Sequence, residues 1–233
     1  MKLWKVGLLA ASALALYASR NTPAAAAPQI KPDPNAPAPP GEVHAWLDAA
    51  EAASGIDGLT DFLTIVAAGE SNFVTTAHND SAGEVEKSAA AYAKQAPKNP
   101  PLLYGQAAAA FGSGGLFGAL APYFLWSGFH ELGAQAPLLG EPPERMFDPA
   151  AACFAAAVFV YRVTTAWGAT DWADVRAAWA SPSLLKEPRG PVYWEKRNKF
   201  PAVAAAAGVD PASLPPLDVS AWPGAGAVWQ ALT

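Results

Sequence analysis

The stretch Gly58-Leu-Thr-Asp-Phe-Leu-Thr-Ile-Val-Ala-Ala-Gly-Glu-Ser-Asn-Phe73 has the pattern of a helix that lies on a hydrophobic core. Its large apolar residues recur at positions i, i+3, i+4 and i+7, namely Leu59, Phe62, Leu63 and Val66. This spacing puts them on one face of an α-helix. Glu70 follows four residues later and continues the same face. The pattern therefore predicts a carboxyl group that points toward the interior, or toward a cleft cut into it.

Glu70 is the first candidate catalytic residue. A carboxyl group withdrawn from water keeps its proton to higher pH, so it can serve as a general acid near neutrality. A glutamate at the frayed end of a helix, turned to solvent or hydrogen-bonded to a neighbour, fits the same spacing. Periodicity alone leaves both interpretations open.

Three stretches resemble the lysozyme-like lytic transglycosylases. Ile65–Phe73 is similar to the catalytic helix of that family, in which a Glu-Ser pair ends a buried helix and an aromatic residue follows closely. Phe111–Leu125 is similar to the Gly-Leu block that lines the sugar cleft. Phe147-Asp-Pro-Ala150 and the apolar run behind it resemble the next core helix. The resemblance covers about residues 41 to 180.

The resemblance implies both a fold and a site. The fold would be all-α, a lysozyme-like helical bundle around a central apolar helix. Glu70 would be the single catalytic acid and base, and cleavage of peptidoglycan glycan strands would leave 1,6-anhydromuramoyl ends. The substrate-binding residues would be Ser71, Gly114, Gly115, Leu116 and Phe117. Neither a cofactor nor a metal is implied.

The chain departs from the family pattern at several points. The Gly-Leu block continues as Phe117-Gly118 where the family has Met-Gln, and the late Tyr-Asn pair of the family is absent. A hydrolytic muramidase is one alternative, with a water held by Asp80, Glu84 or Glu86. A non-catalytic, lysozyme-fold component of a phage virion or cell envelope is the other.

Composition and charge exclude other classes. The chain has 233 residues and a formal net charge of −5, so it lacks the basic surface that binds a nucleic-acid backbone. Cys153 is the single cysteine, which rules out an internal disulfide. The three histidines, His44, His78 and His130, are scattered, so no zinc motif is present.

The N-terminus has the pattern of an export signal. Met1–Lys5 is basic and Val6–Tyr17 is apolar, but the run is shorter than the ~20 residues that span a bilayer. We therefore expect residues 1–27 to be a signal peptide or N-terminal membrane anchor, and residues 28–40 to be a Pro/Ala-rich linker. The folded body at 41–213 would then be periplasmic or exported, with an inner-membrane association as an option, and 214–233 would be an irregular tail.

Several helix boundaries also follow from the sequence. Asp57 or Thr60 is expected to cap the Glu70 helix, and Ser81-Ala-Gly-Glu84 matches a capping box. Residues 116–132 are expected to form a helix with a kink at Pro122. Asp148-Pro149 is a strong helix start, and the helix that follows is expected to reach Trp167 as the hub of the bundle.

Overall fold

The computed structural model describes residues 40–233. The predicted signal peptide or anchor, residues 1–27, lies outside the described residues. So does the predicted linker, residues 28–40, except for Pro40, which begins the first described helix. Across the described part of the chain, no helix combines the length and the apolar character that a membrane span requires. The body is mostly helical, which confirms the all-α class.

The helices follow one another with short connections. The α-helices are α2 (Pro40–Ser54), α3 (Leu59–Glu70), α4 (Ala82–Gln95), α5 (Gly105–Phe111), α6 (Ala121–Leu125), α7 (Phe129–Leu132), α8 (Pro149–Thr165), α9 (Trp172–Ala180), α10 (Pro191–Ala206) and α11 (Ala225–Leu232). Short 3₁₀ helices are η1 (Ala96–Lys98), η2 (Gly133–Gln135), η3 (Pro143–Phe147) and η4 (Pro182–Leu185). Three two-residue strands complete the body: β1 (His78–Asn79), β2 (Ser113–Gly114) and β3 (Ala119–Leu120).

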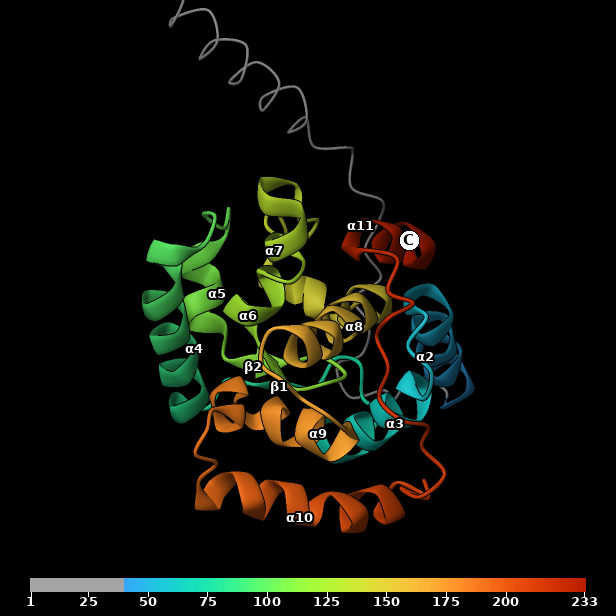
Figure 1. The fold of residues 1–233 in the computed structure, drawn as a ribbon. Coiled ribbons are helices and arrows are strands. Elements are labelled where there is room, and N and C mark those ends of the chain that lie inside the picture. The colour runs from blue at the N-terminus through green and yellow to red at the C-terminus, as the bar shows by residue number, and fades with distance from the viewer. Residues whose placement is uncertain (1–39) are drawn as a thin grey trace, which may run out of the picture. The chain divides into compact units, whose positions relative to one another are not determined.

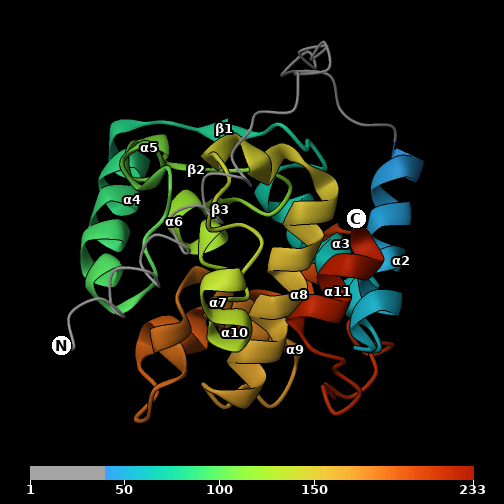
Figure 2. The ribbon, with the colours of Figure 1, turned by 90° about the horizontal axis from the view of Figure 1, so that it is seen from above.

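Helix α8 runs through the middle of the body (Figures 1 and 2). Helices α4, α5 and α6 lie on one side of it and α2 and α11 on the other, while α9 lies between α8 and α10. Asp148 caps α8, because its carboxylate accepts a hydrogen bond of 2.9 Å from the amide of Ala150. The predicted start of the central helix is therefore confirmed, and the helix ends at Thr165, two residues earlier than expected.

Helix α3 buries the predicted apolar face completely, since Leu59, Phe62, Leu63 and Val66 have no exposed surface. Its N-terminus is capped differently from the prediction. Gly58 is the capping residue and has no side chain to offer, so Glu51 of α2 accepts a 2.7 Å hydrogen bond from the amide of Thr60. The prediction of a cap by Asp57 or Thr60 was wrong because the acceptor comes from a neighbouring helix.

The three strands form a small antiparallel sheet in the order β1-β2-β3. Gly114 of β2 pairs with His78 of β1 and with Ala119 of β3. The sheet therefore joins the segment that follows α3 to the Gly-Leu block, residues 111–125, although α4 and α5 separate them in the sequence.

Residues 116–132 do not form one kinked helix. Pro122 lies in the first turn of α6, where its missing amide costs no hydrogen bond, so it begins a helix rather than bending one. Gly128, with φ +82°, then separates α6 from α7. Ser81 is the N-cap residue of α4, as predicted, but the side-chain contacts of a capping box are absent. The Ser81 hydroxyl makes no capping hydrogen bond, and Glu84 pairs with Lys87.

The C-terminal residues 214–233 are not an irregular tail throughout. They include α11, whose residues Val228 and Leu232 are buried against α2 and α8. Upstream, Trp172 donates a 2.8 Å hydrogen bond from its indole nitrogen to the carbonyl of Pro215. The folded body therefore extends past residue 213. The Gly and Pro residues of this segment led to the prediction of an irregular tail, although its last residues form the short apolar helix α11.

Candidate active site

Glu70 is the last residue of α3 and lies at the surface of the body. About a third of its side chain, 31%, is exposed, and its Oε1 accepts a hydrogen bond of 2.9 Å from Nη2 of Arg176 on α9. The helical face that carries the carboxyl group is buried up to Ala67 and emerges from the core at Glu70. Withdrawal of this carboxyl group from water is therefore only partial, and an arginine occupies one of its oxygens.

The Glu-Ser pair lies against the Gly-Leu block. The Ser71 hydroxyl is 2.8 Å from the carbonyl oxygen of Leu116, to which it donates, and 3.2 Å from that of Ala67. A Cβ atom built on Gly118 would lie 3.2 Å from Oε2 of Glu70, so the carboxyl group contacts this glycine directly. The Glu-Ser pair and the Gly-Leu block, which are far apart in the sequence, thus meet in space, as residues of one shared site must.

A small apolar pocket of about 90 Å³ opens beside these residues. Its walls include four of the predicted substrate-binding residues and two aromatic side chains from other helices: Gly114, Gly115, Leu116, Phe117, Phe159 and Trp179. Glu70 and Ser71 do not line the pocket. They adjoin it through Gly118, which lies between the lining residues Phe117 and Ala119. The volume is far below the ~300 Å³ of a small-ligand pocket, so the pocket can hold one small group but not a sugar ring.

Trp179 of α9 contacts residues from several elements that surround the pocket. Its indole nitrogen donates a 3.2 Å hydrogen bond to the carbonyl oxygen of Phe117. Its ring lies edge-on to three phenylalanines, with centroid distances of 5.8 Å to Phe62, 6.1 Å to Phe117 and 4.7 Å to Phe159. Trp179 therefore joins α3, α8 and the Gly-Leu block. Tyr161 of α8, in contrast, stacks on Trp222 with a centroid distance of 4.6 Å.

The chain leaves Glu70 through a strained turn. Asn72 and Phe73 have φ angles of +51° and +63°, in the left-handed region that residues other than glycine rarely adopt. An asparagine tolerates this conformation, whereas a phenylalanine there is unusual. Such strain persists only where the surrounding structure enforces it, and it is concentrated at functional sites. The backbone geometry is therefore a second reason, besides the motif, to treat the end of α3 as a candidate site.

The glycines of the Gly-Leu block serve internal packing. A Cβ atom on Gly115 would lie 2.3 Å from the carbonyl oxygen of Met146, and one on Gly112 would lie 2.3 Å from that of Asn79. Protein backbone therefore fills the space where the missing side chains would be. These two glycines therefore allow one part of the chain to approach another closely.

The other acidic residues considered for a water-activating role are either in a local ion pair or exposed. Glu84 bonds to Lys87 at 2.5 Å, and this hydrogen bond lowers the pKa of Glu84 below its usual value. Asp80 and Glu86 are exposed. Within residues 40–233, no three His, Cys, Asp or Glu side chains gather closely enough to hold a metal ion.

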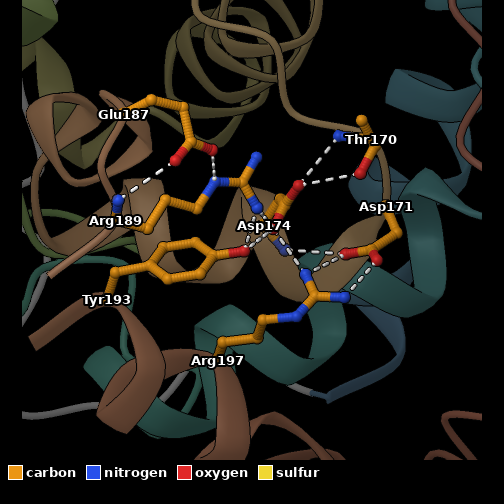
Figure 3. Close-up of polar contacts among 7 residues, drawn as sticks. All are labelled: Thr170, Asp171, Asp174, Glu187, Arg189, Tyr193 and Arg197. Carbon is orange, nitrogen blue, oxygen red and sulfur yellow. Dashed lines mark hydrogen bonds and ion pairs between the residues drawn. The ribbon is translucent and has the colours of Figure 1, made fainter. Parts of the chain in front are cut away.

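A buried polar network underlies α9, and sequence reasoning did not anticipate it (Figure 3). The carboxylate of Asp174 is fully buried and accepts hydrogen bonds from the Thr170 amide at 3.0 Å and its hydroxyl at 2.9 Å. The Tyr193 hydroxyl and the guanidinium groups of Arg189 and Arg197 donate to its other oxygen. The network therefore attaches α10 to α9, the helix that carries Arg176 and Trp179.

The network shifts the proton affinities of its members. Burial raises the pKa of Tyr193, and its hydrogen bond to Asp174 raises it further. The hydrogen bond from Arg197 to Asp171 raises the pKa of Arg197, so this guanidinium remains charged. Burial alone would raise the pKa of Asp171, but the contacts from Arg197 and from backbone amides outweigh it and the pKa is lowered. The three pKa shifts favour a neutral Tyr193, a positively charged Arg197 and a negatively charged Asp171.

Sequence reasoning missed Arg176 and Asp174. Both residues lie in α9, and their partners are distant in the sequence. Arg176 pairs with Glu70 on α3, and Asp174 accepts a hydrogen bond from Tyr193 on α10. An aspartate two residues before an arginine on a helix gives no sign of burial.

No protein-family model, no curated protein and no solved structure matches this chain. The functional argument therefore depends on the geometry of the site.

Proposed function

We propose that this protein cleaves the MurNAc-GlcNAc glycosidic bond of peptidoglycan as a lytic transglycosylase with Glu70 as its single catalytic carboxyl group. The observation that carries the proposal is the contact between the two motifs. The hydroxyl of Ser71 bonds to the carbonyl of Leu116 at 2.8 Å, and Glu70 lies against Gly118 at the edge of the apolar pocket.

The proposed reaction needs one proton shuttle. Glu70 donates its proton to the glycosidic oxygen as the bond between that oxygen and C1 breaks. The resulting carboxylate then removes the proton of the C6 hydroxyl of the same sugar as O6 attacks C1, which closes the 1,6-anhydro ring and restores the acid. A hydrolase would need a carboxylate to activate water, and ordinary glycosidases use two carboxyl groups for their chemistry.

The pocket supports a role in orienting the substrate. Phe117, Phe159 and Trp179 provide apolar walls, and the volume of about 90 Å³ suits the methyl end of an N-acetyl group. Binding this group would fix the position of the neighbouring C1 relative to Glu70. Correct positioning of reacting atoms contributes a large part of the rate in such reactions.

The lysozyme-like arrangement is part of the same proposal. It is supported by a helix that ends in Glu70 and by a central apolar helix. The N-terminal sequence suggests that the body acts outside the cytoplasm, in the periplasm or in exported form, where its substrate lies.

The second candidate is a non-catalytic structural or binding component of a cell envelope or phage virion. The ion pair between Arg176 and Glu70 favours it, because one carboxylate oxygen is already occupied. The small size of the pocket favours it as well.

Glu70→Gln separates the candidates. Purified cell-wall sacculi are incubated with the wild type and the variant, turbidity is followed, and the soluble products are analysed by mass spectrometry. We expect the wild type to release anhydro-ended fragments and Glu70→Gln to be about 10²–10⁴-fold slower, the usual contribution of a general acid. Glu42→Gln, a substitution at an exposed carboxylate of α2, is the matched control and should behave as wild type. Equal turbidity loss with both proteins, or none with either, removes the enzyme proposal, and reducing ends in place of anhydro ends would indicate a muramidase.

A further inference from the structure

We propose that Arg176 recognises a carboxylate of the glycan, and that this contact releases Glu70 for proton transfer. Arg176 would then make cleavage selective for acid-bearing glycans over neutral ones. This inference rests on the proposed function and adds a specificity residue to it.

The Arg176 side chain makes few polar contacts for a side chain that is mostly buried. Only 18% of its side chain is exposed, yet within the described part of the chain its one ion pair runs through a single nitrogen, Nη2, to Oε1 of Glu70. Its Nε is buried and has no hydrogen-bond partner in residues 40–233. A buried donor without a partner costs free energy and calls for an explanation.

Arg197, on α10, provides the comparison within the same body. It uses both terminal nitrogens, bonding to Asp171 at 2.5 and 2.7 Å and also to Asp174. Paired contacts of this kind fix a guanidinium group in place. Arg176 has the single contact instead, so it can exchange its partner at a smaller cost than Arg197 can.

The exchange follows from the chemistry of the two partners. A carboxylate that accepts from a guanidinium group is ionised in that contact, whereas the carboxyl group that starts glycosidic cleavage must carry a proton. The carboxylate of an incoming glycan can accept two hydrogen bonds from the Arg176 guanidinium group in a bidentate pair. This pair would replace the single hydrogen bond from Arg176 to Glu70. A neutral glycan has no group of this kind and leaves the ion pair in place.

The position of Arg176 suits this role. It lies on α9 one turn before Trp179, which lines the pocket, and its partner Glu70 lies against Gly118 at the pocket edge. A sugar whose N-acetyl group entered the pocket would bring its other substituents close to α9. In peptidoglycan the carboxylate is either on the lactyl group of an unsubstituted muramoyl residue or on the stem peptide.

The experiment compares substrates and variants. Cleavage rates are measured on intact sacculi, on glycan strands stripped of peptide, and on neutral chitin oligosaccharides, for the wild type, Arg176→Gln, Arg176→Lys and the exposed-site charge control Lys199→Gln. We expect kcat/KM of the wild type to favour the acid-bearing substrates. In Arg176→Gln that preference should fall about 10–100-fold, partly because neutral chitin is cleaved faster, with Arg176→Lys intermediate and Lys199→Gln unchanged. Preference for stripped strands identifies the lactyl group, and preference for sacculi identifies the stem peptide.

A uniform loss of rate on all substrates in Arg176→Gln would mean a structural role and would overturn the inference. Binding provides a readout that does not depend on catalysis. N-acetylmuramic acid and its neutral methyl ester are titrated into each protein and followed by NMR. Stronger binding of the free acid by the wild type, lost in Arg176→Gln and retained in Lys199→Gln, supports the inference even if no glycan is cleaved and the proposed function fails. Equal binding of acid and ester overturns it.

Discussion

Replacement of Asp174 by asparagine should destabilise the body by about 3 kcal/mol. The carboxylate receives the two Thr170 donors on Oδ2 and those of Tyr193, Arg189 and Arg197 on Oδ1. An asparagine of the same shape offers one accepting oxygen and an NH₂ group that donates. If its oxygen faces Tyr193 and the arginines, its NH₂ group confronts the Thr170 amide, and the opposite orientation opposes donors to donors at three groups.

The magnitude follows from what is lost. Charge-assisted hydrogen bonds contribute about 1.5–3 kcal/mol each, and breaking a buried ion pair by removing one partner costs about 3–5 kcal/mol. The two guanidinium groups are not fully buried, with 20% and 27% of their side chains exposed, so each can turn toward water or toward its other partner. This relief puts the expected cost at the lower end of the range.

The assay is urea unfolding followed by tryptophan fluorescence, with the melting temperature from calorimetry. For a body of this size a loss of about 3 kcal/mol corresponds to a melting temperature lower by roughly 6–12 °C. Asp171→Asn is the matched control, since it makes the same chemical change three residues earlier, at a carboxylate that is 43% exposed. Asparagine is also a good N-cap residue, so the control should lose about 1 kcal/mol. Equal losses in the two variants would refute the reasoning that burial of Asp174 sets the cost.

Three further predictions concern the site and the core. Ser71→Ala should lower the free energy of unfolding by about 1–2 kcal/mol in urea titrations, because it leaves the carbonyl at the other end of its 2.8 Å hydrogen bond unpaired. Gly115→Ala should cost about 3 kcal/mol or more, since φ is +71° and the new Cβ would meet the carbonyl of Met146, whereas Gly140→Ala, with no atom within 4 Å, should lie within about 0.5 kcal/mol of wild type. Cys153 should resist thiol reagents in the native protein at pH 8 and react once the protein unfolds, because burial raises its pKa to about 12 and leaves about one molecule in ten thousand as thiolate.

The sequence predicted best those elements whose signals are local. The stripe of α3 and the Asp148-Pro149 start of α8 were confirmed, since periodicity and capping depend only on neighbouring residues. Capping of α3 by Glu51 could not be predicted, because the acceptor belongs to another helix. The break between α6 and α7 was missed for a related reason. Apolar residues continue through Gly128, and only its positive φ, which the tertiary structure sets, divides the run.

The site divides in the same way. Glu70 and Ser71 stand out in the sequence because they end a buried stripe. Four residues of the Gly-Leu block line a pocket near them, and their role in binding substrate stays a prediction. Arg176 could not be predicted, because its significance comes from a contact with a residue more than one hundred positions away. Charge pairs across helices leave no periodic signal in a single sequence.

Helix α9 connects the stability of the body to the chemistry of the site. Its inner side carries Asp174, which is fixed by the partners from α10, and the next turns carry Arg176 and Trp179, which contact Glu70 and the carbonyl of Phe117. A helix is stiff over this length, so its position relative to α3 sets the distance between guanidinium and carboxylate. The buried charge of Asp174 costs desolvation that an apolar residue would avoid. A buried carboxylate at this place is explained if α9 must be held in one register, because a small shift would change the contact between Arg176 and Glu70 or withdraw Trp179 from the pocket wall.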